Sequence, residues 1–211
     1  MAGVYCKHNK IIFLHIPKTG GTSLSHTIRK HPFFIGSKAY HDHKKISEFK
    51  KIVPTSRFKR CFKFTCVRNP FSMLVSLYNF ILKNQKAPDY TMVRDGGFGA
   101  FVKNFCDTNF SYFDYMEHDG KNLMNFVIKF ENMREDTHTA LKMINEHIKS
   151  FRNTIPAYGA TVTEPNLHIE IEYHNIGIKT NFLDYYSDGK IIDMVRKKFE
   201  RELKYFNYYI E

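Results

Sequence analysis

The chain has 211 residues, of which 43% are apolar and 25% charged, and this length and composition suit one globular domain that folds without disulfides or metal. Its formal net charge of +11 favours an anionic partner such as a nucleotide, a nucleic acid, an acidic glycan or a membrane surface. Four cysteines without a C-x-x-C pair argue against a zinc site, and no apolar stretch approaches the roughly 20 residues of a membrane span. We therefore expect a soluble, cytoplasmic protein.

Two strand-to-helix junctions open the chain. Residues 11–16 (IIFLHI) are nearly all apolar and predict a buried parallel strand that ends at Pro17, followed by a helix over residues 22–31. Residues 62–67 (FKFTCV) predict a second strand. Asn69-Pro70 then predicts a helix start, because asparagine caps helices and proline favours their first position.

The second half of the chain continues the alternation. Residues 86–121 are expected to be irregular and aromatic, residues 125–130 to form a third strand, and residues 133–150 a helix. Residues 152–189 are expected to be loop-rich, with one last helix after them. We therefore predict a single α/β domain over residues 1–211, with a central parallel sheet flanked by helices in three layers, and 86–121 and 152–189 as insertions on the acceptor side. Such sheets bind ligands beyond the carboxyl ends of their strands.

The first junction has the composition of a phosphate-binding loop. It reads Pro17-Lys18-Thr19-Gly20-Gly21-Thr22-Ser23 and joins a buried strand to a helix. Adjacent glycines let N–H groups converge on an anion, the helix N-terminus adds partial positive charge, and Lys18 adds a full one. The simpler alternative is a tight turn in which Thr22 only caps the helix. The loop is not of the Walker A type, because Lys18 precedes the glycines.

The second junction adds a cation where a nucleoside triphosphatase would need an acidic residue. Arg68 follows the second strand, and Ser76 lies eight residues later on the polar face of the next helix. Together they could hold a second phosphate, with arginine as a bidentate donor. Taken alone, this pair is better explained by an arginine in a surface ion pair and a serine that faces solvent. Together with the first loop, phosphate binding becomes the better interpretation.

These residues resemble the sulfotransferases that use 3′-phosphoadenosine 5′-phosphosulfate (PAPS). Residues 17–23 resemble their 5′-phosphosulfate loop, and Val67-Arg68-Asn69-Pro70 with Ser76 resembles their 3′-phosphate motif. Phe130-Glu131-Asn132-Met133 and the ending FERELKYFNY (199–208) resemble later family segments. The resemblance implies a P-loop-like fold and PAPS as sulfuryl donor without a required metal. The cofactor-binding residues that it implies are Lys18, Thr19, Gly20, Gly21, Thr22, Ser23, Arg68 and Ser76.

One further segment resembles the carbohydrate branch of that family. Tyr40-His41-Asp42-His43 is similar to the Tyr-His-Gly-His segment of uronyl 2-O-sulfotransferases, with Asp42 in place of the glycine. The resemblance implies a hydroxyl-bearing acceptor, a glycan in the first instance, with Lys18, His43 and His41 as catalytic residues. Histidine titrates near neutrality and suits the base role, which we assign to His43 with His41 as second base or orienting group. Glu48 and Asp95 are alternative bases.

Other features stay open at this level. Lys179 could contact the nucleotide, while His15 fits buried structure better than catalysis, and His168 and His174 have no assigned role. The aromatic residues of the middle region could line an acceptor site or pack as a lid that hinges at Gly96, Gly97 and Gly99. A small-molecule kinase and a basic nucleic-acid-binding domain are the competing functions, and lysines and arginines around the second strand (residues 44–60) keep the latter open.

Overall fold

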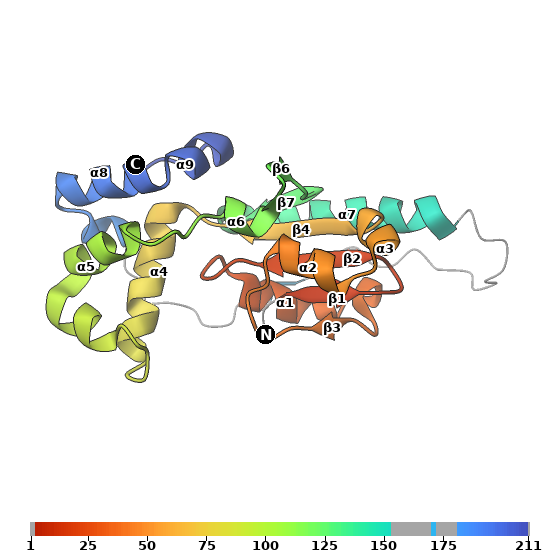
Figure 1. Ribbon diagram of the computed structural model, residues 1–211, viewed down its shortest axis with the longest axis horizontal. Helices are drawn as coiled ribbons and strands as arrows, with labels where there is room; N and C mark the ends of the chain where they lie inside the picture. Colours follow the sequence, from red (N-terminus) through yellow and green to blue (C-terminus); the bar gives the residue numbers. More distant parts are fainter. Residues whose placement is uncertain (1–2, 153–169, 172–180, 211) are drawn as a thin grey trace. The chain divides into compact units, whose positions relative to one another are not determined.

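The computed structural model describes residues 3–152, 170–171 and 181–210, except for the side chain of Arg152. By its contacts the chain divides into two compact units. The described residues of the first unit are 3–67, 114–152 and 170–171, and those of the second are 68–113 and 181–210 (Figure 1). The chain passes from the first unit to the second directly after the strand that ends at Val67.

The first unit is built on a five-stranded sheet in the order β3-β1-β2-β4-β7. Its parallel centre consists of β2 (Ile11–His15), β4 (Phe62–Val67) and β7 (Phe126–Lys129), in a register that places His15 opposite Cys66 and Val67 opposite Lys129. Two short strands, β1 (Val4–Cys6) and β3 (Lys38–Ala39), extend the sheet beyond β2 in antiparallel pairing and were not predicted. The carboxyl ends of three parallel strands therefore lie along one edge of the sheet.

Helices cover both faces of this sheet. Leu24 and Ile28 of α1 (Gly21–Arg29) share one apolar core with α7 (Met133–Arg152), and α2 (Ile46–Ile52) and α3 (Thr55–Lys59) form a second core. Alternate residues of β2 enter the two cores, which explains why the strand is apolar throughout. The predicted three-layer α/β architecture is confirmed. A short hairpin, β5 (Glu117–His118) with β6 (Lys121–Asn122), follows α6 (Phe113–Met116).

The second unit is helical and aromatic. It contains α4 (Pro70–Lys83), α5 (Tyr90–Cys106), α8 (Gly189–Lys198) and α9 (Glu200–Phe206), with a 3-10 turn at Phe182–Tyr185. The fully buried Tyr112 donates its hydroxyl proton to the carbonyl oxygen of Arg68 at 2.8 Å. The buried carboxylate of Glu202 accepts hydrogen bonds from the Ser111 hydroxyl (2.6 Å) and the Tyr112 N–H (3.0 Å). These bonds join the end of the middle segment to the C-terminal helix.

Two expectations about secondary structure were wrong. Residues 86–121 are not irregular throughout, because residues 90–106 form α5, which bends at Gly97 where φ is +69° and ψ is −172°. Three glycines and the absence of an apolar stripe hide this helix in the sequence. The final helix is broken at Phe199, where α8 gives way to α9. Among the described helices, none has both the length and the apolar character needed to cross a bilayer.

Candidate functional site

The loop between β2 and α1 has a backbone suited to an anion. Lys18 and Gly20 both adopt left-handed conformations, with φ of +63° and +83°. The helix begins at Gly21, and its N-cap is Gly20, which has no side chain to cap it. The alternative in which Thr22 serves only as a cap is therefore not what the structure shows. A helix N-terminus presents N–H groups that have no intrahelical partner, and this makes the start of α1 suited to an anion.

Side chains below the loop hold it in place. Thr19 is fully buried, and its hydroxyl donates to the carbonyl oxygen of Ile16 at 2.8 Å. The Cys66 thiol of β4 donates to the carbonyl oxygen of Thr19 at 3.0 Å. The Thr19 side chain is thus committed to the fold, and only its main chain remains for a ligand. Thr22 is half-buried and Ser23 nearly buried.

Neighbouring rings explain the two glycines. A Cβ at Gly20 would lie 2.5 Å from both Phe130 and Met133, which belong to the segment after β7. A Cβ at Gly21 would lie 2.0 Å from the Cδ2 atom of His15. Any side chain at either position would displace a packed neighbour, so the loop requires glycine for space as well as for conformation.

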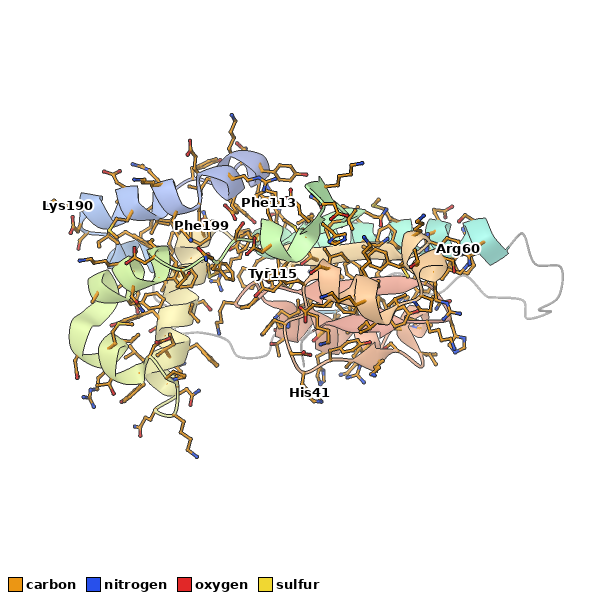
Figure 2. The ribbon with its side chains drawn as sticks, viewed as in Figure 1. His41, Arg60, Phe113, Tyr115, Lys190 and Phe199 are labelled. Carbon is orange, nitrogen blue, oxygen red and sulfur yellow. The ribbon has the colours of Figure 1, made fainter. Side chains whose placement is uncertain are left out.

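The histidines of the Tyr-His-Asp-His segment lie differently. The Nδ1 atom of His43 is 2.8 Å from the carbonyl oxygen of His15, and the two rings are 4.5 Å apart between centroids in an edge-on arrangement. His43 is itself exposed, whereas His15 is 5% exposed. His41 is exposed at the margin of the first unit and points away from the ribbon (Figure 2). The structure therefore brings His43, and not His41, to the strand end that leads into the loop.

The two alternative bases have structural partners. The Glu48 carboxylate accepts a hydrogen bond from the Lys45 N–H at 2.7 Å and closes the N-terminus of α2. Asp95 is paired with Arg94 at 2.6 Å, and this hydrogen bond holds the pKa of the Asp95 carboxyl below its usual value. Neither carboxylate is placed by these contacts at the loop.

The arginine motif lies in the second unit, at the start of α4. Asn69 caps the helix by accepting a hydrogen bond from the Phe71 N–H, as predicted. The Arg68 Nε–H donates to the hydroxyl oxygen of Ser72 at 2.9 Å, and the Ser72 hydroxyl donates to the Asn69 carbonyl oxygen at 3.1 Å. Ser76 is half-buried one turn further along the same face of the helix. Ser72 was not predicted, although its spacing of four from Arg68 could have suggested it.

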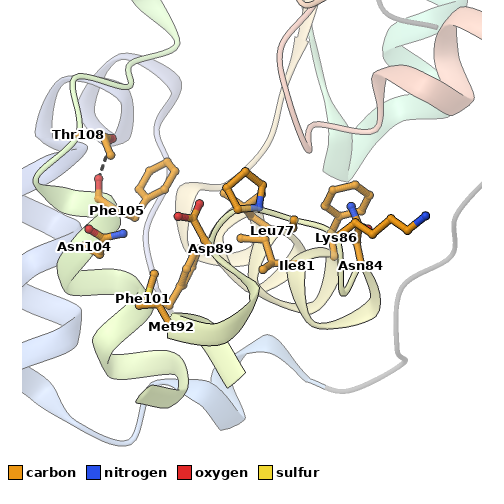
Figure 3. Close-up of a pocket in the computed structure, with 13 residues that line it drawn as sticks. Leu77, Ile81, Asn84, Lys86, Asp89, Met92, Phe101, Asn104, Phe105 and Thr108 are labelled. Atoms are coloured by element: carbon orange, nitrogen blue, oxygen red, sulfur yellow. Dashed lines mark hydrogen bonds between the residues drawn. The ribbon is translucent and has the colours of Figure 1, made fainter. Parts of the chain in front are cut away.

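A cavity of about 430 Å³ lies between α4 and α5 in the second unit (Figure 3). Phe101 and Phe105 line it, as two of the aromatic residues expected to face an acceptor, together with Leu77, Ile81 and Met92 of the two helices. Its polar lining comes from Asn84, Lys86, Asp89, Asn104 and Thr108. Other aromatic residues of the middle region pack on the C-terminal segment. Phe98 contacts Tyr185 of the 3-10 turn, and Phe110 contacts Phe199 between α8 and α9.

Several basic residues that kept the nucleic-acid alternative open are engaged in ion pairs. Lys44 pairs with Asp42 at 2.5 Å, Lys45 with Asp114 at 3.4 Å, and Lys50 with Asp119 at 3.6 Å. In the described part of the chain, no group of three or more histidines, cysteines or acidic residues is placed to hold a metal ion. His168, His174 and Lys179 lie outside the described residues.

Comparison with known proteins gives two findings. The sequence matches the family model described as "Sulfotransferase family" over residues 3–209. Among solved structures, the crystal structure of mouse sulfotransferase SULT7A1 complexed with PAP is similar at a TM-score of 0.49 and 18% identity, with 88% of this chain and 82% of that chain covered. A search of curated proteins found no match.

Proposed function

The chain belongs to the sulfotransferase family, and we propose that it transfers the sulfuryl group of PAPS to a carbohydrate hydroxyl with His43 as general base. The observation that carries the proposal is the loop of residues 18–23. It combines an ammonium group, two glycines and a helix that begins after a glycine N-cap, and it lies at the carboxyl edge of the parallel strands. Such a loop binds a phosphate group through N–H groups and a cation.

We assign the 5′-phosphosulfate to this loop. The N–H groups of Gly20 to Ser23, with the Thr22 and Ser23 hydroxyls, bind the 5′-phosphate, and Thr19 contributes its main chain. Lys18 contacts the bridging oxygen between phosphate and sulfate, where negative charge develops as the S–O bond breaks. The packing of Phe130 and His15 against the glycines supports this assignment, because a loop fixed in advance need not reorganise to bind its ligand.

We assign the 3′-phosphate to Arg68 and Ser76. The bond from Arg68 Nε–H to Ser72 orients the guanidinium group, and Ser76 follows on the same helical face. Arginine suits this role because its planar donors match phosphate oxygens in pairs. The 3′-phosphate distinguishes PAPS from adenosine nucleotides without it, so these two residues are expected to set donor specificity.

In the transfer step, His43 removes the proton of the acceptor hydroxyl as its oxygen forms a bond to sulfur. The S–O bond to the 5′-phosphate breaks, and 3′-phosphoadenosine 5′-phosphate (PAP) leaves with the bridging oxygen. General base catalysis contributes roughly 10²–10⁴ in rate. His43 is favoured over His41 because His43 is held by a hydrogen bond at the strand end that leads into the loop, whereas His41 faces solvent.

A carbohydrate acceptor is supported by the Tyr-His-x-His likeness and by the net charge of +11. Transfer from radiolabelled PAPS is therefore compared between a desulfated uronic-acid polysaccharide, a tyrosine peptide and a simple alcohol. We expect the polysaccharide to be the preferred acceptor. Preference for either of the other two would replace this part of the proposal while leaving the donor site intact.

The donor site is tested by calorimetric titration with PAP, and with AMP, which differs from PAP only by the 3′-phosphate. ATP without and with Mg²⁺ serves as the comparator for a kinase. We expect PAP to bind at micromolar or lower Kd and to be preferred to both. Lys18→Ala should weaken PAP and AMP alike, whereas Arg68→Ala and Ser76→Ala should remove the preference for PAP.

The exposed Lys142 of α7 supplies a charge-matched control, because Lys142→Ala removes the same charge away from the loop. Unchanged PAP binding in Lys18→Ala, or an equal loss in Lys142→Ala, would overturn the assignment. His43→Ala should bind PAP normally and lose turnover, while His41→Ala should retain most of it. The reverse result would move the base to His41.

A further inference from the structure

His15 joins two parts of the first unit that lie apart in the sequence. As the last residue of β2, it stands just before the loop of residues 18–23. Its carbonyl oxygen lies 2.8 Å from Nδ1 of His43, and its ring lies 4.5 Å from that of His43. On its other side the same ring occupies the space that a Cβ of Gly21 would need. One nearly buried residue therefore touches both the loop and the histidine assigned as base.

The contact with the His15 carbonyl oxygen determines which ring nitrogen of His43 carries the proton. A main-chain carbonyl oxygen can only accept a hydrogen bond, so the Nδ1 atom of His43 must carry the proton. In the neutral imidazole the other nitrogen, Nε2, then holds the lone pair. The reacting atom of a base at this position is thus Nε2.

The contact between the two rings sets the distance of His43 from the loop and the orientation of its ring. The His15 imidazole lies against Gly21 on the loop, since an added Cβ there would be 2.0 Å from the ring, and its centroid is 4.5 Å from that of His43. A smaller residue at position 15 would leave room for the His43 ring to rotate and for the loop to shift. Displacements of about 1 Å can cost a factor of about 100 in rate.

We propose that His15 is a positioning residue. Its carbonyl oxygen fixes His43 in the Nδ1–H tautomer, with Nε2 as the reacting nitrogen, and its ring holds the His43 ring at a fixed distance from the loop. The proposal rests on the proposed function, since it concerns the same site. It assigns no proton transfer to His15 itself.

The tautomer is tested on the unaltered chain by long-range ¹H–¹⁵N correlation spectra of the histidine rings. The His43 signals are assigned from their loss in His43→Gln, and spectra are recorded at a pH where the ring is neutral. We expect His43 to be protonated at Nδ1, although free histidine prefers Nε2–H. A His43 ring protonated at Nε2 would overturn the proposal, whatever the activity of the enzyme.

The positioning of His43 by the His15 ring is tested by combining substitutions at the two residues. We expect His15→Ala to lower kcat about 10–100-fold with little change in KM, and to have almost no further effect when His43 is already alanine. His15→Gln serves as a second variant if the alanine variant folds poorly. His147→Ala is the matched control, because His147 is a half-buried ring of the same unit that packs on Phe62 and Phe151.

The steric contact gives a third readout. Gly21→Ala should weaken PAP binding, and part of that loss should be restored in Gly21→Ala/His15→Ala, because removal of the ring relieves the collision. Equal rate losses from His15→Ala with and without His43, or no restoration in the double variant, would overturn the inference. Failure of the proposed function looks different: the unaltered chain would not bind PAP, or His43→Ala would retain normal turnover.

Discussion

Gly20 is expected to be one of the most sensitive positions of the first unit. Its φ of +83° lies in the left-handed region, where an L-residue costs roughly 1–2 kcal/mol. A Cβ there would also lie 2.5 Å from Phe130 and Met133, and overpacking of this kind costs typically about 1–3 kcal/mol. Gly20→Ala should therefore lower the free energy of unfolding by about 2–5 kcal/mol, out of a total of about 5–15 kcal/mol for a typical domain.

Gly120 allows the two contributions to be separated. It has a similar φ of +70° in the same unit, and among the described residues no atom lies within 4 Å of a Cβ built there. Gly120→Ala should therefore show only the conformational cost of roughly 1–2 kcal/mol. In thermal unfolding, where each kcal/mol lowers Tm by about 2–4 °C for chains of this size, Gly20→Ala should melt clearly below Gly120→Ala.

A further substitution identifies the cause. If the collision with Phe130 causes part of the loss, Gly20→Ala should lower the free energy of unfolding less in a Phe130→Ala background than in the unaltered chain. The two losses should differ by about 0.5–3 kcal/mol. Equal Tm values for Gly20→Ala and Gly120→Ala, or strictly additive losses with Phe130→Ala, would refute the reasoning. The loop would then not be held by this packing.

Two further predictions concern stability. Asn69→Ala should lower the free energy of unfolding by about 1–2 kcal/mol in denaturant, because it removes the cap on the Phe71 N–H and the hydrogen bond to the Tyr209 carbonyl oxygen at 2.8 Å. Asn69→Asp should retain the cap and lose less stability. Equal losses in the two variants would contradict the capping role. Burial raises the pKa of the Cys61 thiol from 9.0 to about 11. The unfolded thiol therefore ionises first, and a contribution of about 2–3 kcal/mol that is present below pH 9 should be lost towards pH 11. Cys61→Ala should show a shallower loss of stability over this range, and parallel curves would exclude Cys61 as the cause.

The central fold could be predicted because its signals are local. An all-apolar strand such as residues 11–15 can only be buried on both faces, and Asn69-Pro70 marks a helix start by its own chemistry. The antiparallel strands β1 and β3 have three and two residues, which is too short for any periodicity. The helix α5 escaped because its glycines lower helix propensity, and because its stability comes from packing against α4 and α8.

The site residues also fall into those that the sequence could predict and those that it could not. Lys18, the two glycines and Arg68 could be chosen from residue type and from their place after a strand. The role of Ser72 depends on which way the Arg68 side chain turns, and the role of His15 depends on a contact with His43 from 28 residues further along the chain. The spacing of four permits the Ser72 contact without requiring it, and no spacing indicates the contact between His15 and His43. The folded structure places each acceptor within 3 Å of its partner.

The loop contains a strained backbone conformation at Lys18, and neighbouring contacts hold it in place. Lys18 is not a glycine, yet it has a φ of +63°, a conformation that costs roughly 1–2 kcal/mol and would relax in an isolated peptide. Hydrogen bonds from Thr19 and Cys66, together with the packing at Gly20, keep the residues next to it in place. Because the surrounding structure meets this cost in the folded state, binding of the donor does not have to meet it. The buried contacts below the loop are thus as much a part of the proposed activity as the side chains that face the ligand.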